Sequence, residues 1–488
     1  MDQGIPLYSS EAVRQLDATA IRAGTPGLQL MQRAGAAAFT ALRRHWPQAR
    51  RVLVLCGAGN NGGDGYVVAR LAREAGLDVC VLALEGRAPA SDDAQAARAA
   101  WAATAEVGSW HAGDPLPAAE VIVDALFGVG LSRALEGHAA ALVERVNTSG
   151  VPVLALDLPS GIDADRGSVP GTAIRAALTM SFVGRKIGLY TGAGRAHAGT
   201  REFDDLGIVD AGAALPPTAH VLDLQRCTGW LPRRADDDHK GRFGHVLVVG
   251  GERGMGGAVR LCGEAAARCG AGLVSVLTRP EHAVALLAAR PELMVLGLDE
   301  GPWPAACERA SVLAIGPGLG REAWGRAQLE RGLARGLPCV LDADALWHLG
   351  PDDRLPTQCV LTPHPGEAAR LLGLDTAGVQ ADRPQSARAL AARFGCRVVL
   401  KGNGSLVAEP SGALWVVDAG NPGMASGGMG DVLTGVVAAL LAQGLSAAQA
   451  AALGALVHAM AGDLAAADAP RGLLASDLFP SLRRLLNR

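Results

Sequence analysis

Asp431 lies in a glycine-rich stretch, NPGMASGGMGDVLTG at 421–435, and this setting could give its carboxylate a chemical role. The apolar run that follows predicts a helix, so residues 427–430 would present backbone N–H groups at its N-terminus, where phosphate groups bind. The stretch lacks the G-x-x-x-x-G-K-[ST] pattern of a P-loop. Asp431 could stabilise only the helix dipole, or it could accept the proton of a hydroxyl that attacks a phosphoryl group.

Lysine is rare in this chain and occurs only at Lys186, Lys240 and Lys401. All three lie in glycine-containing stretches, GRKIGLY, HKGRFG and LKGNG. If arginine has replaced lysine wherever either serves, the remaining lysines mark sites that need a compact ammonium group. Lys401 ends a predicted strand in LKGNGSLV, a setting that suits a nucleotide phosphate. The residues alone assign no role to Lys186 or Lys240.

Three predicted strands in the first half of the chain end in polar turns: LCGAGNNGGDGYVVAR at 55–70, VDALFGVGLSR at 123–133 and LALDLPSGIDADRG at 154–167. Each alone could be an ordinary turn or helix cap. The carboxyl ends of parallel strands meet at one edge of a sheet, however, and ligands bind there. Oxygen-bearing side chains at that edge can hold a cation or sugar hydroxyls. The residues concerned are Asn60, Asn61, Asp64, Asp124, Asp157 and Ser160.

Similar turns follow predicted strands in the second half. The turn GMGGAVRLC at 254–262 could let a flat substrate approach the backbone, although close packing of helix on sheet explains it equally well. AIGPGLGR at 314–321 is a second glycine turn. LTPHPGEAARLL at 361–372 presents His364 between two prolines. A lone histidine is more often structural, but one that prolines fix at the carboxyl end of a strand is a candidate for a site.

The composition predicts a globular protein of two or three domains, since 488 residues exceed what one hydrophobic core supports. The net charge of −3, with both signs spread along the chain, gives no reason to expect nucleic acid or an anionic membrane as a partner. No apolar run has the length of a membrane span, and no basic-then-apolar signal begins the chain. The nine cysteines lack C-x-x-C spacing, which favours reduced thiols and a cytoplasmic location.

Short β-type runs alternate with Ala-rich helical stretches in both halves of the chain. This alternation predicts an α/β architecture with mainly parallel sheets and helices on both faces of each sheet. The segments AGAALPPTAH and LPRRADDDHKGRFG interrupt the pattern and predict a linker. We therefore expect two three-layer αβα domains, at 1–215 and 239–488, joined by a linker at 216–238.

The motifs GNNGGDG, DALFGVGL and DLPSGIDAD, in this order, resemble the NAD(P)H-hydrate epimerase domain across nearly all of residues 1–215. This resemblance implies interconversion of the R and S forms of hydrated NADH or NADPH (NADHX and NADPHX), with Asp157 as the acid/base. It also implies a potassium ion held by Asn61, Asp124 and Ser160. The substrate residues that it implies are Asn60, Asn61, Gly62, Gly63, Asp64, Gly128, Val129, Gly130, Leu131, Ser132, Arg133, Ala134 and Asp157.

The motifs GPGLG, LTPHPGE, LKGNG and GNPGMASGGMGDVLTG resemble the ADP-dependent NAD(P)H-hydrate dehydratase, a member of the ribokinase-like superfamily, through 239–488. Met429 stands where many relatives carry threonine. The resemblance implies that phosphate, transferred to the ring hydroxyl from ADP with Mg²⁺, then leaves, and that Asp431 is catalytic. The substrate residues that it implies are Ala258, Gly318, His364 and Asp431. The ADP residues that it implies are Lys401, Gly402, Asn403, Gly404, Ser405 and Gly430.

Taken together, the two resemblances predict a bifunctional repair enzyme whose epimerase supplies the S form that the dehydratase consumes. The small-molecule partners would be NADHX or NADPHX and ADP, and we expect a homo-oligomer. Two alternatives stay open from the residues: a vitamin-type small-molecule kinase, and a first domain that only binds. The residues also leave open ADP against ATP and NADHX against NADPHX.

Overall fold

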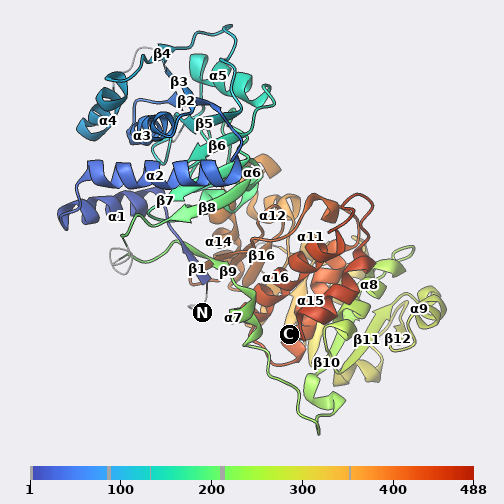
Figure 1. Cartoon of the computed structure of the whole chain (residues 1–488). Helices are drawn as coiled ribbons and strands as arrows, with labels where there is room; N and C mark the ends of the chain where they lie inside the picture. Colours follow the sequence, from blue (N-terminus) through green and yellow to red (C-terminus); the bar gives the residue numbers. More distant parts are fainter. Residues whose placement is uncertain (1–3, 85–88, 132, 209–214, 351–352, 488) are drawn as a thin grey trace. The chain divides into compact units, whose positions relative to one another are not determined.

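The computed structural model describes residues 4–84, 89–131, 133–208, 215–350 and 353–487. It divides into two compact units (Figure 1). The first unit is Pro6–Ala219. The second is His220–Arg488 together with the N-terminal segment Met1–Ile5, as far as that segment is described. Strand β9 (Ala219–Leu222) and helix α7 (Leu224–Thr228) lie within the stretch predicted as a linker.

The first unit is built on a seven-stranded sheet in the order β4-β3-β2-β5-β6-β7-β8, and every pair of neighbours is parallel. The central strand β5 is buried at all of its positions, as expected for a parallel strand that is covered on both faces. The strands are β2 (Arg51–Cys56), β3 (Asp78–Ala83), β4 (Gly108–Ser109), β5 (Val121–Ala125), β6 (Val153–Leu156), β7 (Leu178–Phe182) and β8 (Thr200–Asp204).

Helices cover both faces of this sheet. Alternate residues of β2 belong to two different apolar clusters, and since side chains alternate along a strand these clusters lie on opposite faces. One cluster contains apolar residues of α2, α3 and α4, and the other contains residues of α5. The helices of the unit are α1 (Ser10–Arg22), α2 (Gly27–His45), α3 (Asn60–Glu74), α4 (Asp92–Ala102), α5 (Gly137–Asn147) and α6 (Gly192–His197).

The second unit has an eleven-stranded sheet in the order β1-β9-β18-β17-β16-β15-β14-β13-β10-β11-β12. Neighbours from β16 to β12 are parallel, whereas β17 runs antiparallel to both β16 and β18. The strands are β1 (Gly4–Leu7), β9, β10 (His245–Val249), β11 (Leu273–Thr278), β12 (Met294–Gly297), β13 (Val312–Ile315), β14 (Cys339–Leu341), β15 (Cys359–Leu361), β16 (Arg397–Leu400), β17 (Leu406–Ala408) and β18 (Leu414–Val416).

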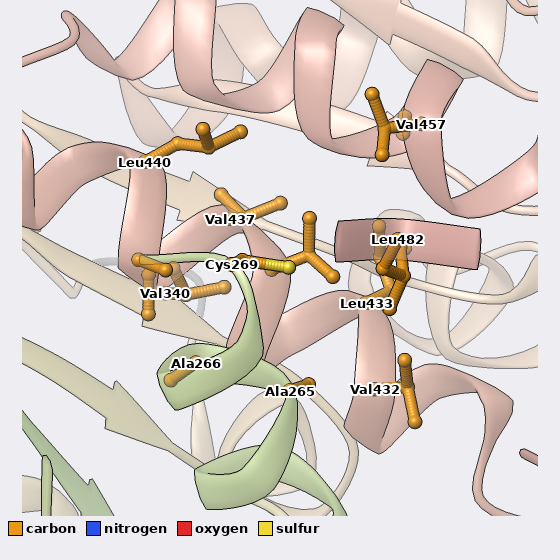
Figure 2. Packing of buried hydrophobic residues seen from close by; sticks show 14 of the residues in the cluster. Ala265, Ala266, Cys269, Val340, Val432, Leu433, Val437, Leu440, Val457 and Leu482 are labelled. Carbon is orange, nitrogen blue, oxygen red and sulfur yellow. The ribbon is translucent and has the colours of Figure 1, made fainter. Parts of the chain in front are cut away.

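Small residues let helices α8 (Gly256–Arg268) and α15 (Met429–Ala442) pack closely in the core of this unit. A Cβ on Gly435 would lie 2.1 Å from the Cys262 carbonyl oxygen, so only glycine fits there. Figure 2 shows Ala265 and Ala266 of α8 near apolar side chains of α15, and Val340 of β14 belongs to the same apolar cluster. The other helices are α9 (Ala283–Ala289), α10 (Ala323–Leu333), α11 (Asp344–His348), α12 (Pro365–Leu372), α13 (Thr376–Ala381), α14 (Arg383–Phe394), α16 (Ala447–Ala465) and α17 (Phe479–Leu485).

The predicted α/β class with mainly parallel sheets is therefore confirmed. Within the described ranges, no helix is long and apolar enough to cross a membrane.

Candidate active sites

The polar residues predicted in the first unit follow neighbouring strands. The turn with Asn60, Asn61 and Asp64 follows β2, and Asp124 lies near the end of β5. Asp157 comes directly after β6, which is the next strand in the sheet. These residues therefore lie along the carboxyl edge, where parallel α/β sheets bind ligands.

A cavity of about 1160 Å³ opens at this edge. Its size suits a nucleotide-sized ligand. Gly62 and Gly63 are not among its lining residues: they are buried in α3, and a Cβ on Gly62 would lie 2.0 Å from the Gly57 carbonyl oxygen. Ser132 lies outside the described residues. The predicted residues that line the cavity are Asn60, Asn61, Asp64, Gly128, Val129, Gly130, Leu131, Arg133, Ala134 and Asp157.

Asp157 is held in an unusual backbone conformation and in an ion pair. Its φ is 65°, in the left-handed region that non-glycine residues rarely adopt. Its Oδ1 accepts a hydrogen bond from the fully buried ammonium of Lys186, which also donates to the Phe182 carbonyl (2.7 Å) and to Ser181 Oγ (3.2 Å). Lys186, for which the sequence predicted no role, thus orients Asp157 toward the cavity that both residues line.

Asp124 and Ser160 form a buried hydrogen-bonded pair. The Ser160 backbone N–H donates to Asp124 Oδ2 (2.8 Å), and its hydroxyl donates to Oδ1 (2.6 Å). Burial raises the pKa of Asp124 to about 6, although these hydrogen bonds oppose the rise. Asn61 is also buried, and within the described ranges neither polar atom of its side chain has a hydrogen-bond partner. An unpartnered buried polar group costs about 1–3 kcal/mol, so Asn61 fits a bound ligand or ion.

The charges of two further carboxyl groups, Asp17 and Asp64, interact with those of Asp157 and Lys186. Asp64 was predicted from its motif, but Asp17 of α1 was missed because no glycine turn or strand end marks it. Burial raises the pKa of Asp17 to about 6, with Lys186 opposing and Asp157 adding to the rise. Burial likewise raises the pKa of Asp64 well above its ordinary value, and the charges of Asp157 and Asp17 raise it further.

The predicted residues of the second unit also follow the strands of one sheet edge. Ala258 lies in the first turn of α8, which follows β10, and Gly318 follows β13. His364 follows β15, and Lys401 follows β16. Gly318 has a φ of 56°, and a Cβ on it would lie 3.2 Å from the Ala258 Cβ. The two glycine turns therefore approach one another, and a larger residue at Gly318 would clash.

A buried ion pair anchors this edge. Lys401 Nζ lies 2.7 Å from Asp342 Oδ1 and 3.9 Å from Glu367 Oε2. The Thr434 hydroxyl of α15 donates to Asp342 Oδ2 (3.0 Å). Burial disfavours the charge of Lys401, but the Asp342 and Glu367 carboxylates outweigh it and raise the pKa of Lys401. Asp342 and Thr434 were not predicted as site residues from the sequence.

Asp431 lies in the first turn of α15, as predicted. The helix begins at Met429 after Gly428, whose φ is 90°, and the Val432 N–H makes a helical bond to the Gly428 carbonyl (3.0 Å). The backbone N–H groups before Val432, at the start of the helix, have no acceptor within the helix and can bind an anion. Burial raises the pKa of Asp431 to about 7, helped by Asp342 and opposed by Lys401. A carboxyl group with this pKa can take up a proton at neutral pH.

Gly430 and the 401–405 turn lie against the same groups. A Cβ on Gly430 would lie 3.1 Å from Asp342 Oδ2 and 3.2 Å from Lys401 Nζ, so glycine keeps access to the ammonium open. The buried Arg383 of α14 donates to the Leu400 (3.3 Å) and Lys401 (3.2 Å) carbonyls. Burial lowers the pKa of Arg383 to about 10. Arg383 thus fixes the backbone that leads into the turn.

His364 has a structural task that its motif did not indicate. Its Nδ1 accepts hydrogen bonds from the backbone N–H groups of Gly366 (3.0 Å) and Glu367 (3.4 Å), so it caps α12. The Glu367 carboxylate in return accepts from the His364 N–H (2.7 Å). Because Nδ1 is the acceptor, a neutral His364 carries its proton on Nε2. The ring remains exposed, which leaves it accessible to a ligand.

Comparison with known proteins agrees with this division of the chain. Residues 27–188 match the model of the YjeF-related protein N-terminus, and residues 246–484 match that of NAD(P)H-hydrate dehydratase. A solved ribokinase-like superfamily protein from Enterococcus faecalis is 30% identical, with a TM-score of 0.51, and covers 56% of this chain and 97% of its own. The fold and sites thus define a two-part α/β enzyme with a ribokinase-like second part.

Two relatives match nearly the whole chain. The bifunctional NAD(P)H-hydrate repair enzyme of Coxiella burnetii is 47% identical and covers 99% of both chains. That of Escherichia coli is 46% identical and covers 94% of this chain and 89% of its own. The chain belongs to the family of bifunctional NAD(P)H-hydrate repair enzymes. The prediction from the motifs is confirmed, and the alternative of a vitamin-type kinase is not favoured.

Proposed function

We propose that the second unit dehydrates S-NADHX and S-NADPHX at the expense of ADP. The observation that carries this proposal is Asp431, whose pKa is about 7, in the first turn of α15 near the Lys401–Asp342 pair. Asp431 removes the proton from the ring hydroxyl as the hydroxyl oxygen attacks the β-phosphorus of ADP. AMP leaves, and phosphate is then eliminated with its C–O bond electrons. Loss of a ring proton restores the double bond.

The residues around Asp431 have complementary tasks in this reaction. Lys401 and the backbone of Gly402, Asn403, Gly404 and Ser405 bind the phosphates of ADP, with Gly430 at the site of transfer. Ala258, Gly318 and His364 position the hydrated dinucleotide. When Mg²⁺ is bound with the nucleotide, it neutralises phosphate charge. Support comes from the Arg383 bonds that hold the nucleotide turn and from the close approach of Gly318 to Ala258.

We propose further that the first unit interconverts the R and S forms in its cavity. Asp157, held by Lys186, moves the proton of the ring hydroxyl. The substrate lies along Asn60, Asn61 and Asp64 and along residues 128–131 and 133–134, all of which line the cavity. A Cβ on Gly128 would lie 3.2 Å from Asp157 Oδ2 and 3.5 Å from the Asn61 Cβ, so these segments approach the acid/base closely.

A potassium ion fits the residues Asn61, Asp124 and Ser160. The unpartnered Asn61 amide supplies an oxygen, and the Asp124 carboxylate and the Ser160 hydroxyl supply two more. Among the described residues, no three His, Cys, Asp or Glu side chains are grouped to hold a metal ion. The donor set of these three residues, one charged and two neutral, suits a weakly charged cation, which would fix the substrate's position when bound.

We assign the epimerase activity to residues 1–215 and the dehydratase activity to residues 239–488. Residues 216–238 are assigned as the linker between them. A cytoplasmic location and a homo-oligomeric state stay predictions, and gel filtration tests the second.

Pure R and S substrates separate the two activities experimentally. Asp157→Ala should slow conversion of R to S, measured by chromatography without ADP, while ADP-dependent dehydration of pure S continues. Asp431→Asn should slow dehydration of S about 100-fold while epimerisation continues. If Asp157→Ala leaves epimerisation unchanged, the first unit only binds its ligand. If S-NADPHX and ADP give a stable phosphorylated product without NADPH, the second unit is a kinase.

A further inference from the structure

Helix α1 presents one face to the epimerase cavity. Val13, Arg14, Asp17 and Ile21 all line it, at the spacing of one helix face. The N-terminus of the helix is fixed by Ser10, whose backbone N–H and hydroxyl donate to the Asp165 carboxylate (2.6 and 2.7 Å). The helix therefore places the Asp17 carboxyl at a fixed position on the cavity wall. Residues 10–22 precede the segment 27–188 that the family model matches.

The same helix also approaches the segment that carries Lys186. A Cβ on Gly184 would lie 3.1 Å from Val13 Cγ2, and the Tyr8 N–H donates to the Arg185 carbonyl (2.8 Å). Asp17 is one helical turn beyond Val13 on the face that lines the cavity. It therefore lies on the side of the cavity that holds the Asp157–Lys186 pair, and the charges of both residues act on it.

The charges around Asp17 do not balance when all groups are ionised. Asp157 and Lys186 neutralise one another, which leaves Asp17 and the half-buried Asp64 of α3 as two like charges. The other charged or titratable side chains that line the cavity are Arg14, Asp93, Arg133, Glu136 and His138. Burial and repulsion therefore favour a proton on Asp17, whereas the Asp157 carboxylate is paired with the Lys186 ammonium. Carboxyl groups whose environments differ in this way supply an acid and a base together.

Inversion of the hydrated ring needs such a pair. Its hydroxyl is on a carbon that is also bonded to the ring nitrogen. When a base takes the hydroxyl proton, the C=O bond forms and the C–N bond breaks with its electrons passing to nitrogen. An acid must then give the nitrogen a proton. Rotation of the open aldehyde and addition of N–H to its other face close the ring in the opposite configuration, and both protons return.

We propose that Asp17 is the second catalytic residue of the epimerase, exchanging the proton of the ring nitrogen while Asp157 exchanges that of the hydroxyl. This assignment rests on the proposed epimerase function. The substrate is a cyclic carbinolamine that opens and closes between the two carboxyl groups, without any external reagent.

The test measures conversion of pure R-NADPHX to S by chromatography without ADP. Asp17→Asn should lower the rate about 100-fold or more, the usual contribution of a positioned acid. ADP-dependent dehydration of pure S by the same protein should be unchanged. The control is Glu11→Gln, which makes the same carboxyl-to-amide change at an exposed position of α1. It should epimerise at the wild-type rate.

The pH dependence separates catalysis from a structural role. In the wild type, kcat/KM for epimerisation should fall as pH rises through about 6, because burial raises the pKa of Asp17 to about that value and the acid form is then lost. Asp17→Asn should remove this decline, and Asp17→Glu should restore it with part of the rate. The proposal would be overturned if Asp17→Asn epimerised at the wild-type rate with the wild-type pH profile. It would also be overturned if Asp17→Asn were slow but its kcat/KM still fell as pH rises through about 6. A wild-type protein without epimerisation would instead refute the proposed function.

Discussion

Lys401→Met would leave the Asp342 carboxylate charged and without its partner. The two charged groups lie 2.7 Å apart, and the Asp342 side chain is only 1% exposed. Removing one partner of a buried ion pair costs about 3–5 kcal/mol, because the other charge stays buried without compensation. Lys401 is itself 22% exposed, so the lower end of this range applies. About 3 kcal/mol corresponds to a fall in the melting temperature of roughly 6–12 °C for a unit of this size.

The double variant Lys401→Met/Asp342→Asn separates stability from activity. It removes the unpaired charge, so thermal unfolding should recover most of the lost stability. Dehydration should not recover, because the ammonium that binds the ADP phosphates is still missing. Both quantities are measured on the full chain, by calorimetry and by the ADP-dependent formation of NADPH. A single variant that melts at the wild-type temperature, or a double variant that melts below the single one, would show that Lys401 does not compensate the buried charge of Asp342.

Three further predictions concern single residues. The wild-type rate of dehydration should rise with pH through about 7, because burial and Asp342 raise the pKa of Asp431 to about 7 and only the carboxylate form accepts a proton. Asp431→Asn should lower kcat about 100-fold and remove this rise. Asn61→Ala should weaken the activation of epimerisation by K⁺, measured as rate against K⁺ concentration. Gly430→Ala should raise KM for ADP in steady-state kinetics, since its Cβ would crowd Lys401 Nζ at 3.2 Å.

Each of these predictions has a result that contradicts it. A wild-type dehydration rate that is flat between pH 6 and 8 would remove Asp431 from the role of base. If the epimerisation rate depends equally on K⁺ in Asn61→Ala and in the wild type, Asn61 does not hold the potassium ion. The dehydration rate of Asn61→Ala, which should be unchanged, serves as the internal control. An unaltered KM in Gly430→Ala would mean that ADP does not approach Lys401 across this glycine.

Much of the fold was predictable because its signals are local. Buried parallel strands are short continuous apolar runs, as in β13, and their alternation with helices defines the class. The motif residues were predictable for a similar reason, since glycine turns at strand ends mark the binding edge of such a sheet. The apolar run after Asp431 predicted its position in the first turn of a helix, whereas its catalytic role was implied only by the family resemblance.

Other parts of the sites depend on contacts between distant segments. Asp342 and Thr434 are 92 residues apart, and nothing in either local pattern indicates that they meet. Asp17 lies on an ordinary amphipathic helix and becomes a site residue only because that helix faces the cavity. Conversely, Gly62 was predicted as a binding residue, but in the structure it packs against the backbone. A Cβ on Gly62 would lie 2.0 Å from the Gly57 carbonyl oxygen.

The fate of the substrate's hydroxyl oxygen distinguishes phosphorylation of the hydroxyl from its direct loss as water. S-NADPHX whose ring hydroxyl carries heavy oxygen is incubated with the protein, ADP and Mg²⁺, and the inorganic phosphate is examined by mass spectrometry. If the hydroxyl is phosphorylated and then expelled, the heavy oxygen appears in the phosphate, in amounts equal to the NADPH and AMP formed. Unlabelled phosphate, with the heavy oxygen released as water, would contradict the account.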